Sequence, residues 1–542
     1  MGITSDGLKG IASKEADPDE MPRKKPFSGK KKKEQLKEKR RKRANRNKNS
    51  QDSVVSNTEG TSQTKQESVS ENSSSTSSVK LVTSFGGNDV RNVDNRLATM
   101  MIREDDEKVR KRRLQGSVPV DTSKQGTFPK AVHTPLKQIL YHPRRPQWKS
   151  NLTAVEVEAN EKIQFDNWCS VIHSSYEQGQ ITPFEHNLEV WRQLWRVVEQ
   201  SDVLLLTCDC RNPLFHISQS LVDECLLLRK PVIIVLTKTD LVPVQHVHQW
   251  IAFLKHLYPF VNVFPFSSRG TLSENELNKL NGGVTSRRKV LKKKPNVQQA
   301  TKSVKQLLLL CAAISNVNIL RNEVDDDTPN NKPLLSIGLC GHPNTGKTSL
   351  VNAIVGRKVA SVSRTAGHTK HLQHIPLDYP KGVYLIDCPG LIFPKEQPRF
   401  LGEVMGLYPI AQIREPFSSI RVVYEYLQLD RLYNLKKPDW YEKADSWSPE
   451  MLCEALAEKK GYMLSRSGAP DIQRAGLEVI TDIVDGVVCL RFDPPNTYTS
   501  GTRSENVNDS KKILEKGVTD LGDNDDSIRN DEEMNAILES MR

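Results

Sequence analysis

The sequence of 542 residues predicts an α/β fold with a mostly parallel sheet and helices on both of its faces. Three observations lead to this prediction. Short apolar runs rich in β-branched residues have the length of buried strands. Segments with helical spacing lie between several runs, for example Ile217–Leu228 and Val304–Ile319. Polar or glycine-containing motifs follow the runs at the end where open α/β sheets bind ligands. The expected strands are Asp202–Thr207, Val232–Leu236, Val261–Phe266, Leu334–Leu339 and Gly382–Ile386.

The strongest motif follows the run Leu334–Leu339 and fits the pattern G-x-x-x-x-G-K-[ST]. A helix is expected directly after it, at Thr348–Ile354, which gives the strand–loop–helix setting that phosphate binding needs. Glycines let backbone N–H groups turn toward phosphate oxygens, Lys347 reaches the β- and γ-phosphates, and the Thr348 hydroxyl binds Mg²⁺. An ordinary glycine-rich turn before a helix is the alternative. The expected phosphate-binding residues are Gly341, His342, Pro343, Asn344, Thr345, Gly346, Lys347, Thr348 and Ser349.

A second motif, Asp387-Cys-Pro-Gly390, ends the run Gly382–Ile386. A carboxylate at a strand end can hold Mg²⁺ through water, and Gly390 can offer its N–H to a γ-phosphate because no side chain blocks the approach. The polar stretch Ser361–Gln373 lies between the two motifs. Thr369 in this stretch is a candidate second hydroxyl ligand for Mg²⁺, and a surface loop without a ligand role is the alternative.

A candidate base-reading loop, Thr237-Lys238-Thr239-Asp240, follows the run Val232–Leu236. The Asp240 carboxylate can accept two N–H bonds from the guanine edge, whereas adenine lacks that pair of donors. The stem of Lys238 can lie along the plane of the base. Ser267 and Ser268 follow the next expected strand, and a backbone N–H there could meet the guanine O6. The base-reading loop therefore precedes the phosphate loop in the chain.

This order of motifs resembles that of the circularly permuted P-loop GTPases of the YlqF/YawG group. The similarity extends to Glu189–Ser201, to residues 400–427 and to Cys208–Leu214, which is similar to the D-x-R-N-P stretch of that group. The basic start Met21–Ser28 resembles one eukaryotic branch of the group. The resemblance implies GTP and GDP as ligands, Mg²⁺ as cofactor and a K⁺ ion held with the help of Asn344. It implies catalytic roles for Lys347, Thr369 and Gly390, metal ligation by Thr348, Thr369 and Asp387, and guanine binding by Thr237, Lys238, Asp240 and Ser267.

Three positions depart from the usual pattern of such enzymes. Thr237 replaces the usual Asn, and Ala366 replaces a common Pro. Leu391 stands where many GTPases carry a water-orienting Gln, which implies slow intrinsic turnover that a partner raises. His368 is a possible donor to that water, or a solvated loop histidine.

Because Leu391 cannot orient a water, the alternative function is a GTP-dependent interaction module in signalling or cell-cycle control, with little or no hydrolysis. An ATPase is a weaker third possibility.

The permutation moves the ends of the nucleotide domain. The chain now leaves this domain directly after the loop that senses the γ-phosphate, so whatever follows residue 395 is tethered to that loop. Ordering of the loop on GTP binding could thus move an appended domain. We expect the C-terminal segment to act as an effector arm.

Charge and composition are uneven along the chain. Residues 21–50 hold fifteen Lys or Arg and two Glu, whereas residues 501–542 hold six basic and eleven acidic residues. The basic segment favours attachment to ribosomal RNA or a pre-ribosomal particle and recognition by nuclear import machinery, with a solubilising tail as the alternative. We expect a monomer in the nucleus or nucleolus, or alternatively in the cytoplasm. The chain has no long apolar run and no signal-type start, which predicts an intracellular protein without a membrane partner.

Nine scattered cysteines without a C-x-x-C pair are expected to be reduced thiols. Cys208, Cys210 and His216 could be imagined as metal ligands, but buried thiols fit better because a fourth ligand is missing. The expected organisation has five parts: a disordered basic and Ser-rich arm at 1–127, a partly helical extension at 128–184, the circularly permuted nucleotide domain at 185–400 with a mobile basic insertion at 270–300, a mainly helical domain at 401–495, and a disordered acidic tail at 496–542.

Overall fold

The computed structural model describes most of the chain between residues 81 and 495. The described residues are 81–83, 100–102, 104–177, 179–270, 283–291, 297–317, 319, 333–359, 372–437, 446–465 and 467–495. Residues 1–77 form a separate unit, and all of the described residues belong to the unit that begins at Ser78. The predicted basic arm, the loop with Ala366, His368 and Thr369, and the acidic tail lie outside the described residues, apart from the end of the arm.

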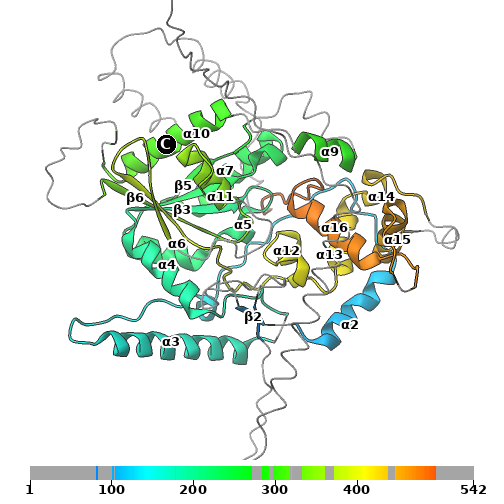
Figure 1. The fold of residues 1–542 in the computed structure, drawn as a ribbon, viewed down its shortest axis with the longest axis horizontal. Helices are drawn as coiled ribbons and strands as arrows, with labels where there is room; N and C mark the ends of the chain where they lie inside the picture. Colours follow the sequence, from blue (N-terminus) through cyan, green and yellow to red (C-terminus); the bar gives the residue numbers. More distant parts are fainter. Residues whose placement is uncertain are drawn as a thin grey trace, which may run out of the picture. The chain divides into compact units, whose positions relative to one another are not determined.

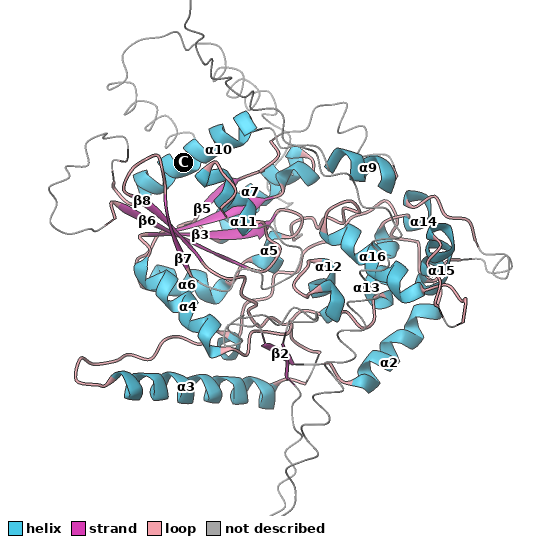
Figure 2. Cartoon of the chain, viewed as in Figure 1, coloured by secondary structure: helices cyan, strands magenta, loops and turns pink. Residues whose placement is uncertain are grey.

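A six-stranded sheet with the order β5-β4-β3-β6-β8-β7 forms the centre of the described fold (Figure 2). The five strands predicted from the sequence pair in parallel, as expected. The edge strand β7 was not predicted and pairs antiparallel with β8. The strands are β3 Val203–Asp209, β4 Val232–Thr237, β5 Asn262–Pro265, β6 Leu335–Gly341, β7 Gln373–Pro376 and β8 Val383–Asp387.

Helices cover both faces of this sheet, and alternate strand residues face two different apolar clusters. Leu204 and Leu206 pack with α4, α6 and α7, whereas Leu205 packs with α10 and α11. Figure 1 shows α10 and α11 on one side of the strands and α4 and α6 on the other. The predicted core tryptophans of α4, Trp191 and Trp195, are buried. The helices are α4 Leu188–Gln200, α5 Pro213–His216, α6 Gln219–Leu227, α7 Val244–Leu257, α10 Val297–Ile314 and α11 Lys347–Val355.

A mainly helical region follows the sheet, as the sequence predicts. Its core is continuous with the α4 face of the sheet through residues such as Leu401, Phe417 and Val479. Glycine in the left-handed region ends α15 at Gly461, where φ is 67°. The helices are α12 Arg399–Val404, α13 Phe417–Tyr426, α14 Leu429–Leu432, α15 Pro449–Lys460 and α16 Ile472–Val484.

The end of the predicted disordered arm is ordered, so the expected boundary at residue 127 is wrong. Residues 104–127 contain the helix α2 (Asp106–Leu114) and pack on the helical region. Arg112 lies 3.5 Å from a Glu415 oxygen and 3.9 Å from a Glu403 oxygen, and both carboxylates are fully buried. The amide of Val120 donates to Trp447 O at 2.9 Å. These charge and backbone contacts order a segment whose composition favoured disorder. Two short strands, β1 Leu81–Thr83 and β2 Met100–Ile102, precede it.

The long helix α3 (Ala154–Ser175) forms most of the predicted partly helical extension. It begins with a capping box in which Thr153 and Glu156 satisfy each other's backbone amides. Among the residues that the structure describes, none of the helices combines the length and the apolar character that a membrane crossing requires.

The insertion at 270–300 was predicted to be mobile and basic, and part of it forms a helix that packs on the fold. Residues 284–291 form the helix α9 (Val284–Leu291). Arg288 of α9 donates to both carboxylate oxygens of Asp482 on α16, at 3.0 and 2.6 Å. Arg287 is partly buried and donates to Val487 O at 3.2 Å. These two arginines therefore bind the helical region instead of extending into solvent.

Candidate functional site

The predicted ligand-binding motifs meet at one edge of the sheet. Strands β3, β4, β5, β6 and β8 run parallel, so their carboxyl ends lie together there. The base-reading loop continues β4, the Ser267-Ser268 segment follows β5, the phosphate loop continues β6, and Asp387 ends β8. Segments that are far apart in the sequence are thus brought into one site, as the motif order requires.

The phosphate loop has a backbone that only glycine fits at its two ends. Gly341 has φ 149°, and a Cβ atom there would lie 2.4 Å from Thr207 Oγ1. Gly346 has φ 94° and precedes the first residue of α11. The Thr345 hydroxyl donates to His342 O at 2.8 Å and lies 2.8 Å from the Thr207 hydroxyl. These contacts fix a tight turn at the amino end of a helix, which suits an anionic ligand.

Lys347 lies inside this loop. Its ammonium donates to Gly341 O at 3.0 Å and to His342 O at 3.1 Å, and the residue is only 7% exposed. Burial lowers its pKa, and the nearby carboxylate of Asp387 opposes that effect. The structure therefore places a buried ammonium group under the phosphate loop, near the Asp387 carboxylate at the carboxyl end of β8.

Asp387 is a buried acid at the end of β8. Both of its carboxylate oxygens are buried without a partner among the described residues. Burial raises its pKa to about 6, and Lys347 opposes the rise. A buried carboxylate without compensation is costly, so the site fits a cation such as Mg²⁺. Thr348 lies in the first turn of α11, and Gly390 lies against the loop, where an added Cβ would meet Pro343 Cα at 3.0 Å. Thr369, the predicted second hydroxyl ligand, lies outside the described residues.

Thr237 links the base-reading loop to the phosphate loop. Its hydroxyl lies 2.5 Å from Thr345 O and 3.0 Å from Cys208 O, so it can donate to either carbonyl. The residue is 3% exposed. The substitution of Thr for the usual Asn therefore leaves a polar group that joins the two halves of the site.

Asp240 is held by the segment after β5. The Ser267 hydroxyl donates to Asp240 Oδ1 at 2.9 Å, and Arg269 Nη1 lies 3.7 Å from Oδ2. Ser268 lies between these two residues in the same turn. The predicted guanine-binding residues thus lie together, with a carboxylate whose orientation is fixed from one side.

Two residues at the end of β3 were not predicted as site residues. Asp209 is buried and accepts from Arg211 Nη2 and Lys238 Nζ, both at 2.8 Å. Burial alone would raise the pKa of Asp209, but Arg211 and Lys238 hold it well below its usual range. The D-x-R-N-P similarity marked these positions, yet nothing in the sequence pattern indicated what Arg211 binds.

His342 and Asn344 show how the loop contacts its surroundings. His342 is buried among the rings of Phe215, His216 and Phe393, at centroid distances of 5.8 to 6.3 Å. Its two ring nitrogens have no hydrogen-bond partner among the described residues. Asn344 Nδ2 donates to Gly406 O at 2.8 Å. The amide proposed to help hold K⁺ is therefore oriented by the helical region. The described residues contain no cluster of His, Cys, Asp and Glu suited to a further metal.

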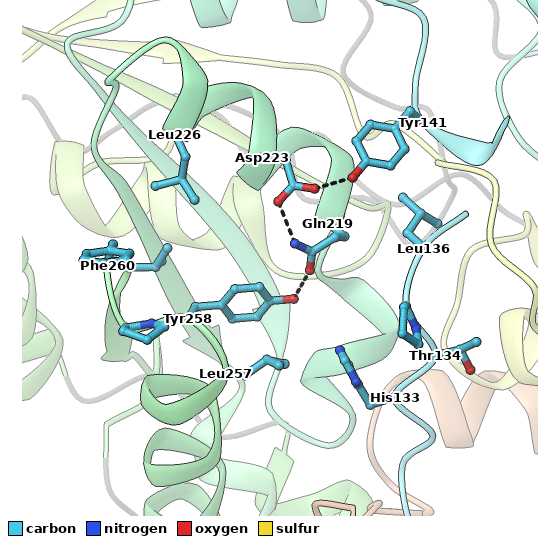
Figure 3. Close-up of a pocket in the computed structure, with 13 residues that line it drawn as sticks. His133, Thr134, Leu136, Tyr141, Gln219, Asp223, Leu226, Leu257, Tyr258 and Phe260 are labelled. Carbon is cyan, nitrogen blue, oxygen red and sulfur yellow. Dashed lines mark hydrogen bonds between the residues drawn. The ribbon is translucent and has the colours of Figure 1, made fainter. Parts of the chain in front are cut away.

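A separate pocket of about 430 Å³ lies between residues 133–141 and the helices α6 and α7 (Figure 3). Its polar groups bind one another: Tyr141 donates to Asp223, Gln219 donates to Asp223, and Tyr258 donates to Gln219. It contains none of the predicted site residues. The predicted site at the carboxyl ends of the strands is therefore distinct from this pocket.

Comparisons with known proteins found similar sequences and structures. A family model described as "50S ribosome-binding GTPase" matches residues 336–414. Guanine nucleotide-binding protein-like 1 of Mus musculus is 32% identical over 428 residues, which cover 70% of this chain and 69% of that protein. Large subunit GTPase 1 of Schizosaccharomyces pombe is 33% identical, over 68% of this chain and 60% of that protein. A solved structure of GNP-bound YlqF from T. maritima is similar at 17% identity and a TM-score of 0.34, covering 57% of this chain and 99% of that one.

Proposed function

Because the chain belongs to the family of GTPases that includes guanine nucleotide-binding protein-like 1, we propose that it binds GTP with Mg²⁺, hydrolyses it to GDP and phosphate, and acts as a nucleotide switch in ribosome biogenesis. The observation that supports the magnesium-dependent chemistry is the pair of buried Asp387 oxygens, for which the described residues offer no hydrogen-bond partner. A bound Mg²⁺ would neutralise charge on the β- and γ-phosphates. Asp387, Thr348 and Thr369 would hold it.

The residues of the site have distinct tasks in this proposal. Backbone N–H groups of the phosphate loop, other than at Pro343, which has none, donate to the phosphates. Lys347 donates to the β- and γ-phosphates after leaving the loop carbonyls that it now binds. Gly390 offers its N–H to the γ-phosphate. Glycine fits this position because a side chain would meet Pro343. Asp240 accepts from the guanine edge while Ser267 fixes its carboxylate. Asn344 would help to hold K⁺ next to the phosphates.

The described residues offer no group that orients the attacking water. Leu391, at the position where many GTPases carry Gln, is 1% exposed and packs in the core. Its backbone amide donates to Gly341 O at 3.3 Å, so the position is fixed as well as apolar. We therefore propose slow intrinsic turnover that a partner accelerates.

The cellular role is proposed from the relatives and from charge. One relative is named for the large subunit and the matching family model is described as ribosome-binding. The basic segment at 21–50 supports binding to ribosomal RNA or a pre-ribosomal particle, nuclear import, and a location in the nucleus or nucleolus, with the cytoplasm as the alternative.

A turnover assay tests the proposal. Purified full-length protein is incubated with GTP and Mg²⁺, with and without K⁺ and ribosomal particles, beside a Lys347→Ala control. We expect GTP loss above the control, increased by particles. No GTP loss above the control in any condition rejects hydrolysis.

The burial of Leu391 favours a second candidate function, a GTP-dependent interaction module that scarcely cleaves its nucleotide and acts in signalling or cell-cycle control. Pull-downs with GDP and with a non-hydrolysable GTP analogue separate the two functions. Enrichment of ribosomal RNA favours the first, and a non-ribosomal protein partner favours the second.

A further inference from the structure

A buried charge network connects the base-reading loop with the helical region. Arg211 is fully buried, and its guanidinium binds the Asp209 carboxylate on one side. On the other side Nη1 donates to Ile483 O at 2.6 Å and Nη2 lies 3.3 Å from Val484 O. These two carbonyls belong to the last turn of α16, where a helix has carbonyls without intrahelical partners and a partial negative charge. Figure 1 shows α16 (orange) beyond the ends of the strands.

The same carboxylate holds the lysine that is predicted to lie along the guanine. Lys238 Nζ lies 2.8 Å from Asp209 Oδ2, and its backbone has φ 57°, in the left-handed region. A lysine side chain has many rotamers, so fixing its ammonium determines where its stem lies. Asp209 therefore fixes the position of the apolar part of the Lys238 side chain before a guanine base binds.

The chain after α16 also packs directly on this loop. A Cβ added at Gly486 would lie 2.4 Å from Leu241 Cδ1, and the Cys489 thiol donates to Leu241 O at 3.4 Å. The amide of Phe492 donates to Arg211 O at 2.8 Å. The residues beyond α16 thus contact both the base-reading loop and the arginine that anchors it.

We propose that Asp209 and Arg211 are positioning residues for guanine recognition. Through them, the shape of the base site depends on how α16 packs against Arg211. This inference rests on the proposed binding of guanine nucleotides and goes beyond it. The network lies on the base side of the site, so GDP and GTP engage it equally. Any guanine nucleotide therefore stabilises the seated helical region, and the seated region in turn raises nucleotide affinity by the same factor, because such coupling is reciprocal.

Variants of the full-length protein test the idea. Arg211→Met removes the bond to Asp209 and to the α16 carbonyls, and Asp209→Asn removes the charge that holds Lys238. Arg288→Met is the matched control, because Arg288 also binds α16 but contacts Asp482 and Glu478 instead of the base-reading loop. We expect Arg211→Met and Asp209→Asn to weaken binding of GDP and GTP alike, by about tenfold, since bonds to charged groups are lost. Arg211→Lys restores part of the affinity, because a lysine keeps the positive charge beside Asp209.

Hydrogen exchange gives a second test. GDP should slow exchange of the amides in the last turn of α16, and this protection should disappear in Arg211→Met. Wild-type binding of GDP without such protection, or an Arg211→Met protein with wild-type affinity for GDP, overturns the inference alone. Failure of the wild-type protein to bind either nucleotide overturns the proposed function, and the inference with it.

Discussion

Replacement of Thr237 by Val tests the contact between the base-reading and phosphate loops. The change removes one hydroxyl and keeps the branched shape. The hydroxyl lies 2.5 Å from Thr345 O, and Thr345 is fully buried, so the variant leaves a carbonyl without this donor in a place that water does not reach. Loss of one such bond costs about 1 to 2 kcal/mol of unfolding free energy.

Nucleotide affinity should fall as well. The hydroxyl holds the two loops together before the nucleotide arrives, and looser loops must be ordered on binding. If most of the lost energy appears in binding, the dissociation constant for GDP rises by about five- to tenfold. Denaturant unfolding of the nucleotide-free protein measures the first effect, and titration with fluorescent GDP measures the second.

Thr237→Ser is the control, because it keeps the hydroxyl and removes a methyl group. We expect its GDP affinity to stay within about twofold of wild type, which corresponds to less than 0.5 kcal/mol. A Thr237→Val protein that matches wild type in both measurements refutes the reasoning. Equal losses in the Val and Ser variants would assign the effect to packing instead of the hydrogen bond.

Three further predictions concern single side chains. Asp240→Asn should shift preference from guanine toward xanthine nucleotides in competition titrations, and unchanged guanine binding would remove Asp240 from the site. Asp387→Asn should raise the stability of the nucleotide-free protein by about 1 to 3 kcal/mol, because it removes a buried charge for which the described residues offer no hydrogen-bond partner. The variant should also lose the gain in GTP affinity that Mg²⁺ provides. A loss of stability would contradict this prediction. Burial lowers the pKa of His216 to about 4, so below the ordinary value of 6.5 protons bind the unfolded chain preferentially. His216 should therefore contribute a loss of about 2 kcal/mol of stability between pH 7 and pH 5, and in urea unfolding His216→Gln should lose about that much less than wild type between the two pH values.

Local sequence patterns predicted the sheet and the positions of the motifs. Strands such as Val232–Thr237 are continuous apolar runs because both faces of a parallel sheet are covered, and this signal is contained within a few residues. The glycines of the phosphate loop are similarly informative, since Gly341 and Gly346 adopt backbone angles that other residues avoid. The strand β7 was missed because an edge strand of four residues with mostly exposed side chains has no such pattern.

Contacts between distant segments were not predictable in this way. The helix α2 buries only Val109, and apart from the exposed Leu114 its other residues are charged, so its composition suggested disorder. Its order comes from Glu403 and Glu415, which are distant in sequence and bind Arg112. In the same way, Arg211 was recognised as part of a motif, while its partners, the carbonyls of Ile483 and Val484, carry no sequence signal at all. The role of Asp209 follows from these contacts and could only be found in the structure.

The anchoring of α2 determines where a force on the preceding chain acts on the described fold. Arg112 and Val120 bind the region of α12–α16 instead of the sheet. Under the proposed binding of a particle by the basic segment, a pull would therefore act first on the helical region, which contacts the nucleotide loops through Arg211 and Asn344. Mechanical load on the leading end of the protein would thus set how long the nucleotide stays bound.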